Sequence, residues 1–208
     1  AGATVVNFSP LYTVDELAHQ VADSGTTILF TVSAKALLPT ALHVLDNSSL
    51  ERLVVGNIAE ALPVFKGLAY RLFKRSETAE IPQDQRITLY SDLLHNDGKF
   101  TPSICDPEKD IALLQYTGGT TGFPKGVMLP HRALYANGLT LVTEGIDTRR
   151  FIGLHAAPMF HLADHAFSNS LAMGGGTHVM LPMFNPQAVA ETIAREKVNA
   201  AMLVPTMI

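Results

Sequence analysis

The chain has 208 residues, of which 47% are hydrophobic and 16% charged, with a formal net charge of −4. These values exclude collagen-like, low-complexity and disordered chains, and a slightly acidic chain without a basic stripe argues against nucleic acid as a partner. A single cysteine, Cys105, excludes an internal disulfide framework and favours a reducing compartment, so we expect a cytoplasmic protein.

Strand and helix patterns alternate along the chain, which predicts an α/β fold with mainly parallel sheets. A capping-box pattern at Thr13 and Glu16 opens the first helix, and Gly25 ends it. The apolar run 27–32 is typical of a strand buried on both faces, and Pro39 is expected to disturb a helix at 34–45. Further strands are predicted at 3–8, 53–56, 111–116, 126–129, 151–157, 177–181 and 200–204, and further helices at 131–142, 162–173 and 186–194.

Two less regular segments follow the strand at 53–56. Apolar and basic residues alternate near helical spacing over 58–75, which indicates either a basic amphipathic helix that contacts a membrane surface or a surface helix packed on the protein. The segment 76–110 is polar and turn-rich, which predicts a long connection with a short helix at 89–94.

The organisation of the chain predicts two α/β subdomains. We expect the first to span 1–145 and to carry a phosphate-binding loop at 116–126, and the second to span 146–208 and to be cut short. Both ends of the chain are apolar, at 3–6 and 200–208, which favours an internal fragment of a longer protein. Incomplete sheets with apolar edges also predict self-association into a homo-oligomer.

The segment 116–126 is rich in glycine and threonine and contains one lysine. It reads Tyr116-Thr117-Gly118-Gly119-Thr120-Thr121-Gly122-Phe123-Pro124-Lys125-Gly126. Glycines let backbone N–H groups approach an anion, threonine hydroxyls add donors, and Lys125 adds a point charge, so the segment predicts a polyphosphate clamp. It is neither a Walker A loop nor a dinucleotide fingerprint, because it runs from strand to strand. The alternative is a flexible glycine loop.

This segment resembles the phosphate-binding signature of the adenylate-forming superfamily, which comprises acyl-CoA synthetases, luciferases and peptide-synthetase adenylation domains. Further matches lie at Pro158-Met159-Phe160-His161, at 1–7 with 10–13 and 16–17, and at 175–179 with 184–186 and 204–207. Together they most resemble the large N-terminal domain of long-chain fatty acid–CoA ligases. Asp164 stands where many relatives carry glycine.

The resemblance implies a two-step reaction that uses ATP, Mg²⁺ and coenzyme A. A fatty acid or other small carboxylic acid attacks the α-phosphate of ATP, and coenzyme A then displaces AMP, giving a medium- or long-chain acyl-CoA. It further implies that Lys125 steadies pyrophosphate and that His161 lies beside the carboxylate and α-phosphate, both as catalytic residues. The residues implied to hold the β- and γ-phosphates are Thr117, Gly118, Gly119, Thr120, Thr121, Gly122 and Lys125.

Several alternatives remain open. His161 is also consistent with a helix-start histidine whose ring is satisfied, and His161 with His165 has the spacing of a metal pair. We nevertheless expect no metal site in this chain, because no glutamate follows His161 as in a zinc-protease motif. The family segments that hold magnesium and ribose, and the domain with the catalytic lysine, are absent from it. The isolated chain is therefore expected to be inactive. The alternative functions are an adenylase for an aryl, short or carrier-linked acid, and a non-catalytic nucleotide-binding relative.

Overall fold

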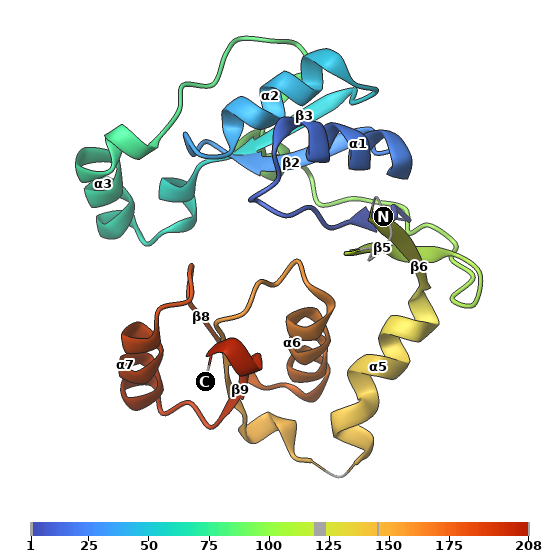
Figure 1. Cartoon of the computed structure of the whole chain (residues 1–208), viewed down its shortest axis with the longest axis vertical. Coiled ribbons are helices and arrows are strands. Elements are labelled where there is room, and N and C mark those ends of the chain that lie inside the picture. Colours follow the sequence, from blue (N-terminus) through green and yellow to red (C-terminus); the bar gives the residue numbers. More distant parts are fainter. Residues whose placement is uncertain (1, 119–123, 145, 208) are drawn as a thin grey trace. The chain divides into compact units, whose positions relative to one another are not determined.

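The computed structural model describes residues 2–118, 124–144 and 146–207 (Figure 1). By their contacts, these residues form two compact units, one of Phe8–Thr101 and the other of Ala1–Asn7 with Pro102–Ile208. The fold is α/β with parallel-rich sheets, as predicted. The predicted subdomain boundary falls at residue 145, outside the described residues, and that division stays a prediction.

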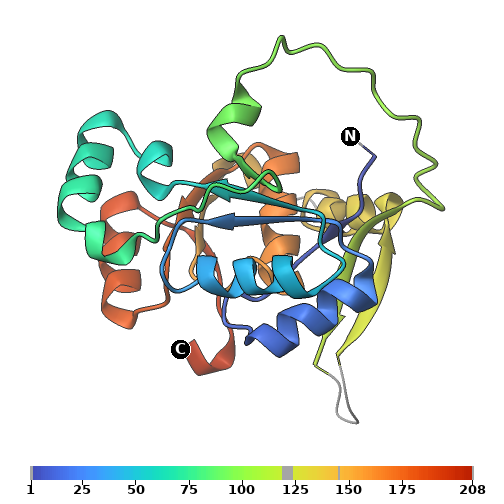
Figure 2. The same cartoon turned by 90° about the horizontal axis from the view of Figure 1, so that it is seen from above.

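The unit Phe8–Thr101 is built on a parallel sheet of β2 (Ile28–Val32), β3 (Arg52–Gly56) and β4 (Ile87–Leu89), with β3 in the centre. Helices α1 (Val14–Ser24) and α2 (Leu38–Asn47) lie along the same side of the β2–β3 pair (Figure 2). Their apolar faces and the inward side chains of the sheet form one core. Its buried members are Leu17, Val21, Leu29, Leu38, Ala41, Val44, Leu45, Leu50, Leu53 and Val55.

Helix α1 confirms the capping-box prediction. The Glu16 N–H donates to the Thr13 hydroxyl at 3.4 Å, and the Thr13 N–H donates to the Glu16 carboxylate at 2.8 Å. These reciprocal bonds satisfy two N–H groups that a helix start otherwise leaves open. The bonds from Thr13 also lower the pKa of Glu16, because they stabilise its charged form. Gly25 ends the helix at φ 65°, a conformation that glycine adopts without strain.

Three predictions for this unit need correction. Strand β2 is not buried on both faces, because Ile28 and Phe30 are 49% and 61% exposed on the face opposite the two helices. Pro39 lies in the first turn of α2, where a missing N–H costs no hydrogen bond, so it does not disturb the helix. The polar connection also contains β4, a strand that was not predicted, directly before the expected short helix α4 (Tyr90–Leu94).

The segment after β3 forms η1 (Ile58–Ala61), α3 (Val64–Phe73) and η2 (Arg75–Glu77). Of α3, all of which is described, Gly67 alone is buried: a Cβ there would lie 2.4 Å from the Ala59 carbonyl oxygen. The large apolar side chains of α3 are exposed, so this helix is not packed on the protein through its apolar residues. They are Val64, Phe65, Leu68, Leu72 and Phe73. Among the described residues, no helix has the length and apolar content needed to cross a membrane.

The other unit begins with a small mixed sheet. Strand β5 (Ile111–Thr117) lies between β1 (Val5–Val6), which is parallel to it, and β6 (Lys125–Pro130), which is antiparallel. Strand β1 is shorter than the predicted 3–8. Helix α5 (His131–Thr143) starts directly after β6, as the pattern predicted.

A second, fully parallel sheet in this unit has the order β8 (Thr177–Met180), β7 (Ile152–His155), β9 (Ala200–Met202). Helices α6 (Leu162–Gly174) and α7 (Pro186–Glu196) complete the alternation. A core of Leu154, Ala156 and Val189 forms between the sheet and α7, and Leu171 and Phe167 of α6 pack against Gly153 of β7. Helices α5 and α6 approach closely at Gly138, where a Cβ would lie 2.5 Å from the Met173 sulfur.

Candidate phosphate and carboxylate site

The glycine- and threonine-rich segment joins two antiparallel strands. Thr117, the last residue of β5, lies directly across from Lys125, the first residue of β6, and both are exposed. The prediction that the segment runs from strand to strand is therefore confirmed. Thr117, Gly118 and Lys125 are described, whereas Gly119, Thr120, Thr121 and Gly122 lie outside the described residues. The phosphate-binding role of all these residues stays a prediction.

The base of this hairpin depends on a glycine. Gly126 lies across from Tyr116, and a Cβ added at Gly126 would lie 3.1 Å from the phenol carbon of the Tyr116 ring. Few real contacts are so short, so the glycine leaves room for the ring to lie over the neighbouring strand. The Tyr116 ring thereby packs over Gly126, the residue that follows Lys125.

The end of β5 is tied to the segment that contains His161. The side-chain amide of Gln115, which is 7% exposed, donates to the Phe160 carbonyl at 3.2 Å. Asn7 donates to the other end of the same amide at 3.5 Å. Gln115 was not predicted as a site residue, although a glutamine inside an apolar strand is a signal that could have indicated it. The bond therefore places the two segments that carry the predicted catalytic residues close to each other.

His161 is the N-cap of α6 and is exposed. Its Nδ1 accepts from the Ala163 backbone N–H at 3.3 Å, and the backbone N–H of His161 donates to the Pro158 carbonyl at 3.0 Å. His161 is thus a helix-start histidine, as one interpretation had it, with a hydrogen bond to one of its two ring nitrogens. Because Nδ1 accepts, a neutral ring carries its proton on Nε2, which can donate to an anion. The helix-start role and the predicted catalytic role are therefore compatible.

Three buried or half-buried side chains form a hydrogen-bonded row beside this histidine. Asp164 is fully buried, and its Oδ2 lies 2.9 Å from His155 Nδ1. His155 Nε2 in turn lies 2.9 Å from His178 Nδ1. Burial lowers the pKa of His178, and the neighbouring His155 lowers it further, because both disfavour a charge there. The spacing of these residues in the sequence gave no signal of the row.

The predicted spacing of His161 and His165 does not produce a metal centre in the described part of the chain. Those residues contain no group of three histidine, cysteine, aspartate or glutamate side chains able to hold a metal ion. His165 instead has its Nε2 3.3 Å from the Asn169 amide nitrogen.

Known proteins match this chain over its whole length. The AMP-binding enzyme family matches residues 1–208. A long-chain-fatty-acid–CoA ligase of Bacillus subtilis is 30% identical over 217 residues, which cover 100% of this chain and 38% of that protein. A probable 4-coumarate–CoA ligase of Dictyostelium discoideum is 29% identical over 204 residues, covering 95% of this chain and 35% of that protein.

Solved structures agree with the sequence matches. The crystal structure of a long-chain-fatty-acid–CoA ligase from Archaeoglobus fulgidus superposes with a TM-score of 0.76 and 30% identity, over 99% of this chain and 35% of that one. The chain thus spans between a third and two fifths of the length of these relatives. With its full length matched by one family and its fold shared with a member of related sequence, the chain belongs to the AMP-binding, adenylate-forming enzymes.

Proposed function

We propose that the protein carrying this chain is an AMP-forming acid–CoA ligase that activates a medium- or long-chain fatty acid. The observation that carries the proposal is the pairing of Thr117 with Lys125 across the hairpin, together with the bond from Gln115 to the His161 segment. A cation and a hydroxyl at one end of a sheet suit a polyphosphate, and a neighbouring imidazole N–H suits a carboxylate.

The chain's own residues have distinct tasks in this proposal. Lys125 offers positive charge to pyrophosphate as the α-phosphate is attacked, and His161 Nε2–H orients the attacking carboxylate or the α-phosphate. Positioning and charge stabilisation of this kind lower the barrier without a covalent enzyme intermediate. These donors are cationic or neutral and therefore fit phosphate rather than Mg²⁺, which prefers carboxylate oxygens. We assign no residue of this chain to Mg²⁺ or to coenzyme A.

The function is tested by ATP–pyrophosphate exchange that depends on added carboxylic acid. We expect exchange by the protein that carries this chain to rise from acetate to oleate, and we expect little or none from the 208-residue chain alone. The largest exchange with an aryl acid such as 4-coumarate would instead favour an aryl-acid ligase. No exchange with any acid would contradict adenylation and favour a non-catalytic nucleotide-binding relative.

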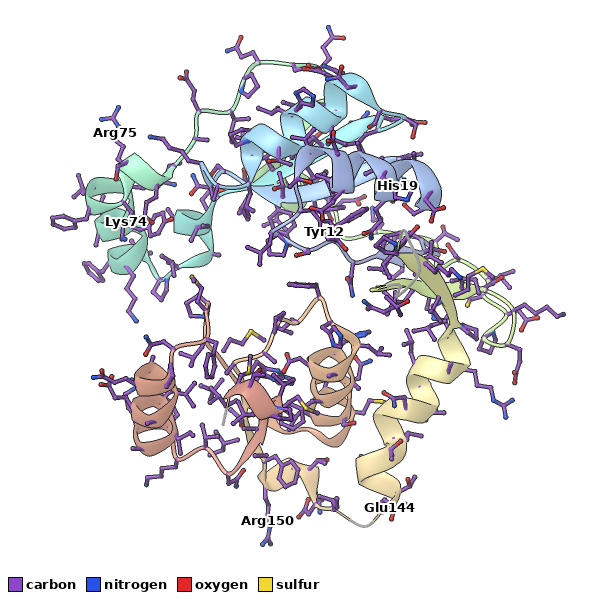
Figure 3. All side chains as sticks on the ribbon, in the orientation of Figure 1. Tyr12, His19, Lys74, Arg75, Glu144 and Arg150 are labelled. Carbon is purple, nitrogen blue, oxygen red and sulfur yellow. The ribbon has the colours of Figure 1, made fainter. Side chains whose placement is uncertain are left out.

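A second candidate function is contact with an anionic membrane surface through α3. Val64, Phe65 and Phe73 are at least 81% exposed, and basic side chains lie between and after them (Figure 3 labels two, Lys74 and Arg75). Two of the basic residues have acidic partners: Arg71 lies 3.6 Å from Glu60, and Lys74 lies 2.5 Å from Glu77. Exposed apolar rings beside clustered cations are typical of helices that bind at the lipid headgroups.

Co-sedimentation with vesicles tests this contact. We expect the chain to bind vesicles that contain phosphatidylserine, and we expect changing Arg71, Lys74 and Arg75 to glutamate to weaken binding by more than about tenfold, since each cation near such a surface contributes about 1 kcal/mol. The matched control reverses three exposed cations that also have acidic partners, Arg149, Arg150 and Arg195. Equal losses in both variants would contradict a specific role for α3.

A further inference from the structure

The loop that carries His161 is closed at its base by two side chains. His155 is the last residue of β7, and Asp164 is in the first turn of α6, nine positions later. Their side chains are 1% and 0% exposed and meet at 2.9 Å. The intervening loop, with His161 near its end, therefore starts and finishes at one buried contact.

In this contact the carboxylate accepts a single hydrogen bond. Oδ2 of Asp164 is bonded to His155, whereas Oδ1 is buried without a hydrogen-bond partner among residues 2–118, 124–144 and 146–207. A buried carboxylate oxygen is costly to desolvate, so the remaining bond has a large influence on where the carboxylate lies. The first turn of α6 is thus anchored to β7 chiefly through His155.

The ring of His155 is itself held in place. The His178 ring meets it through nitrogens 2.9 Å apart, with only 11° between the two ring planes. Phe167 of α6 packs on it at a tilt of 46°, with the ring centres 5.3 Å apart. The His155 ring therefore has neighbours on β8 and on α6, and these restrict its rotation.

When Asp164 is ionised and both imidazoles are neutral, the donors and acceptors of the row fit a single arrangement of protons. His155 must then carry its proton on Nδ1 in order to donate to Oδ2. Its Nε2 is then an acceptor, so His178 must also carry its proton on Nδ1. These tautomers are observable, because protonated and unprotonated ring nitrogens differ in their ¹⁵N chemical shifts.

We propose that Asp164 and His155 are positioning residues that hold the first turn of α6, and with it His161, against the end of β7. The same short loop receives the Gln115 bond at Phe160, so His161 is fixed from two sides. Asp164 thereby has a defined task in this chain. The inference rests on the proposed function only where it gives His161 a role in catalysis.

Histidine NMR on the 208-residue chain tests the proposal without any turnover. In the unchanged chain we expect protonated Nδ1 on both His155 and His178. In Asp164→Ala we expect His155 to lose the protonated Nδ1 and the ring signals of His161 to shift. The Ala163 amide donates to His161, and we expect its hydrogen exchange to become about tenfold faster, as loss of one hydrogen bond allows. Asp164→Asn, whose amide oxygen can accept the same bond, should restore most of the His161 signals.

The matched control is Leu171→Ala, which removes from the same helix a fully buried side chain that takes no part in these hydrogen bonds. A purely structural role predicts that this variant perturbs His161 as much as Asp164→Ala does, and that result would overturn the proposal. Absence of a proton on Nδ1 of His155 in the unchanged chain would also overturn it. Because this test is read by NMR, a negative result in the ATP–pyrophosphate exchange assay would leave its outcome unaffected.

Discussion

Lys125→Ala is expected to lower acid-dependent ATP–pyrophosphate exchange by about 10²- to 10³-fold in the protein that carries this chain, the loss typical when one preorganised charge-stabilising donor is removed. Lys125 opens β6 directly across from Thr117, so its backbone is fixed by strand pairing while its exposed side chain is available to a ligand. The charge that develops on pyrophosphate would then lose the stabilisation by this cation. The rate of exchange at saturating ATP and acid is the measurement.

Two variants make this result specific. Lys125→Arg keeps the charge but changes its shape, so it should retain part of the activity. Lys109→Ala removes another exposed lysine, one paired with Asp106 at 3.2 Å, and should leave exchange unchanged. Unfolding by urea should be alike in all of them. Full exchange by Lys125→Ala would contradict the role assigned to this lysine.

Leu53→Ala is expected to lower the free energy of unfolding by about 2–5 kcal/mol, the usual cost of emptying a fully buried leucine site. Leu53 is 0% exposed on the central strand β3, where it lies between Leu29 of β2 and Ile87 of β4. Strands on both sides limit how far the sheet can collapse into the resulting space. Urea unfolding followed by circular dichroism measures the loss.

Phe65→Ala is the control for that variant, since it removes a larger side chain that is 88% exposed on α3. We expect its free energy of unfolding to change by no more than about 0.5 kcal/mol, as at other exposed positions. If Phe65→Ala proved as costly as Leu53→Ala, the exposed placement of the apolar face of α3 would be wrong.

Local signals in the sequence predicted the elements well where the chemistry is itself local. The capping box at Thr13, the glycine at position 25 and the start of α7 at Pro186, where a helix over 186–194 was predicted, are each decided by neighbouring backbone groups. The strand–loop–strand character of 116–126 was also correct. These features need no knowledge of which elements meet in space.

Predictions that depend on tertiary neighbours were less successful. The apolar run of β2 could not reveal that helices cover one face only, and β4 has too few residues to show a period. The row of Asp164, His155 and His178 joins a helix and two strands that are adjacent only once the β7–β8 pairing has formed. No spacing rule links such positions.

The position of the glycine- and threonine-rich segment between antiparallel strands has an electrostatic consequence. Many phosphate sites lie at the start of a helix, whose aligned peptides add roughly half a positive charge. Strands contribute only small net dipoles, so a hairpin must obtain its cationic character from side chains and separate N–H groups. With Lys125 as the cation within 116–126, nucleotide affinity should fall steeply as salt concentration rises, because an exposed ammonium is screened far more than a buried dipole.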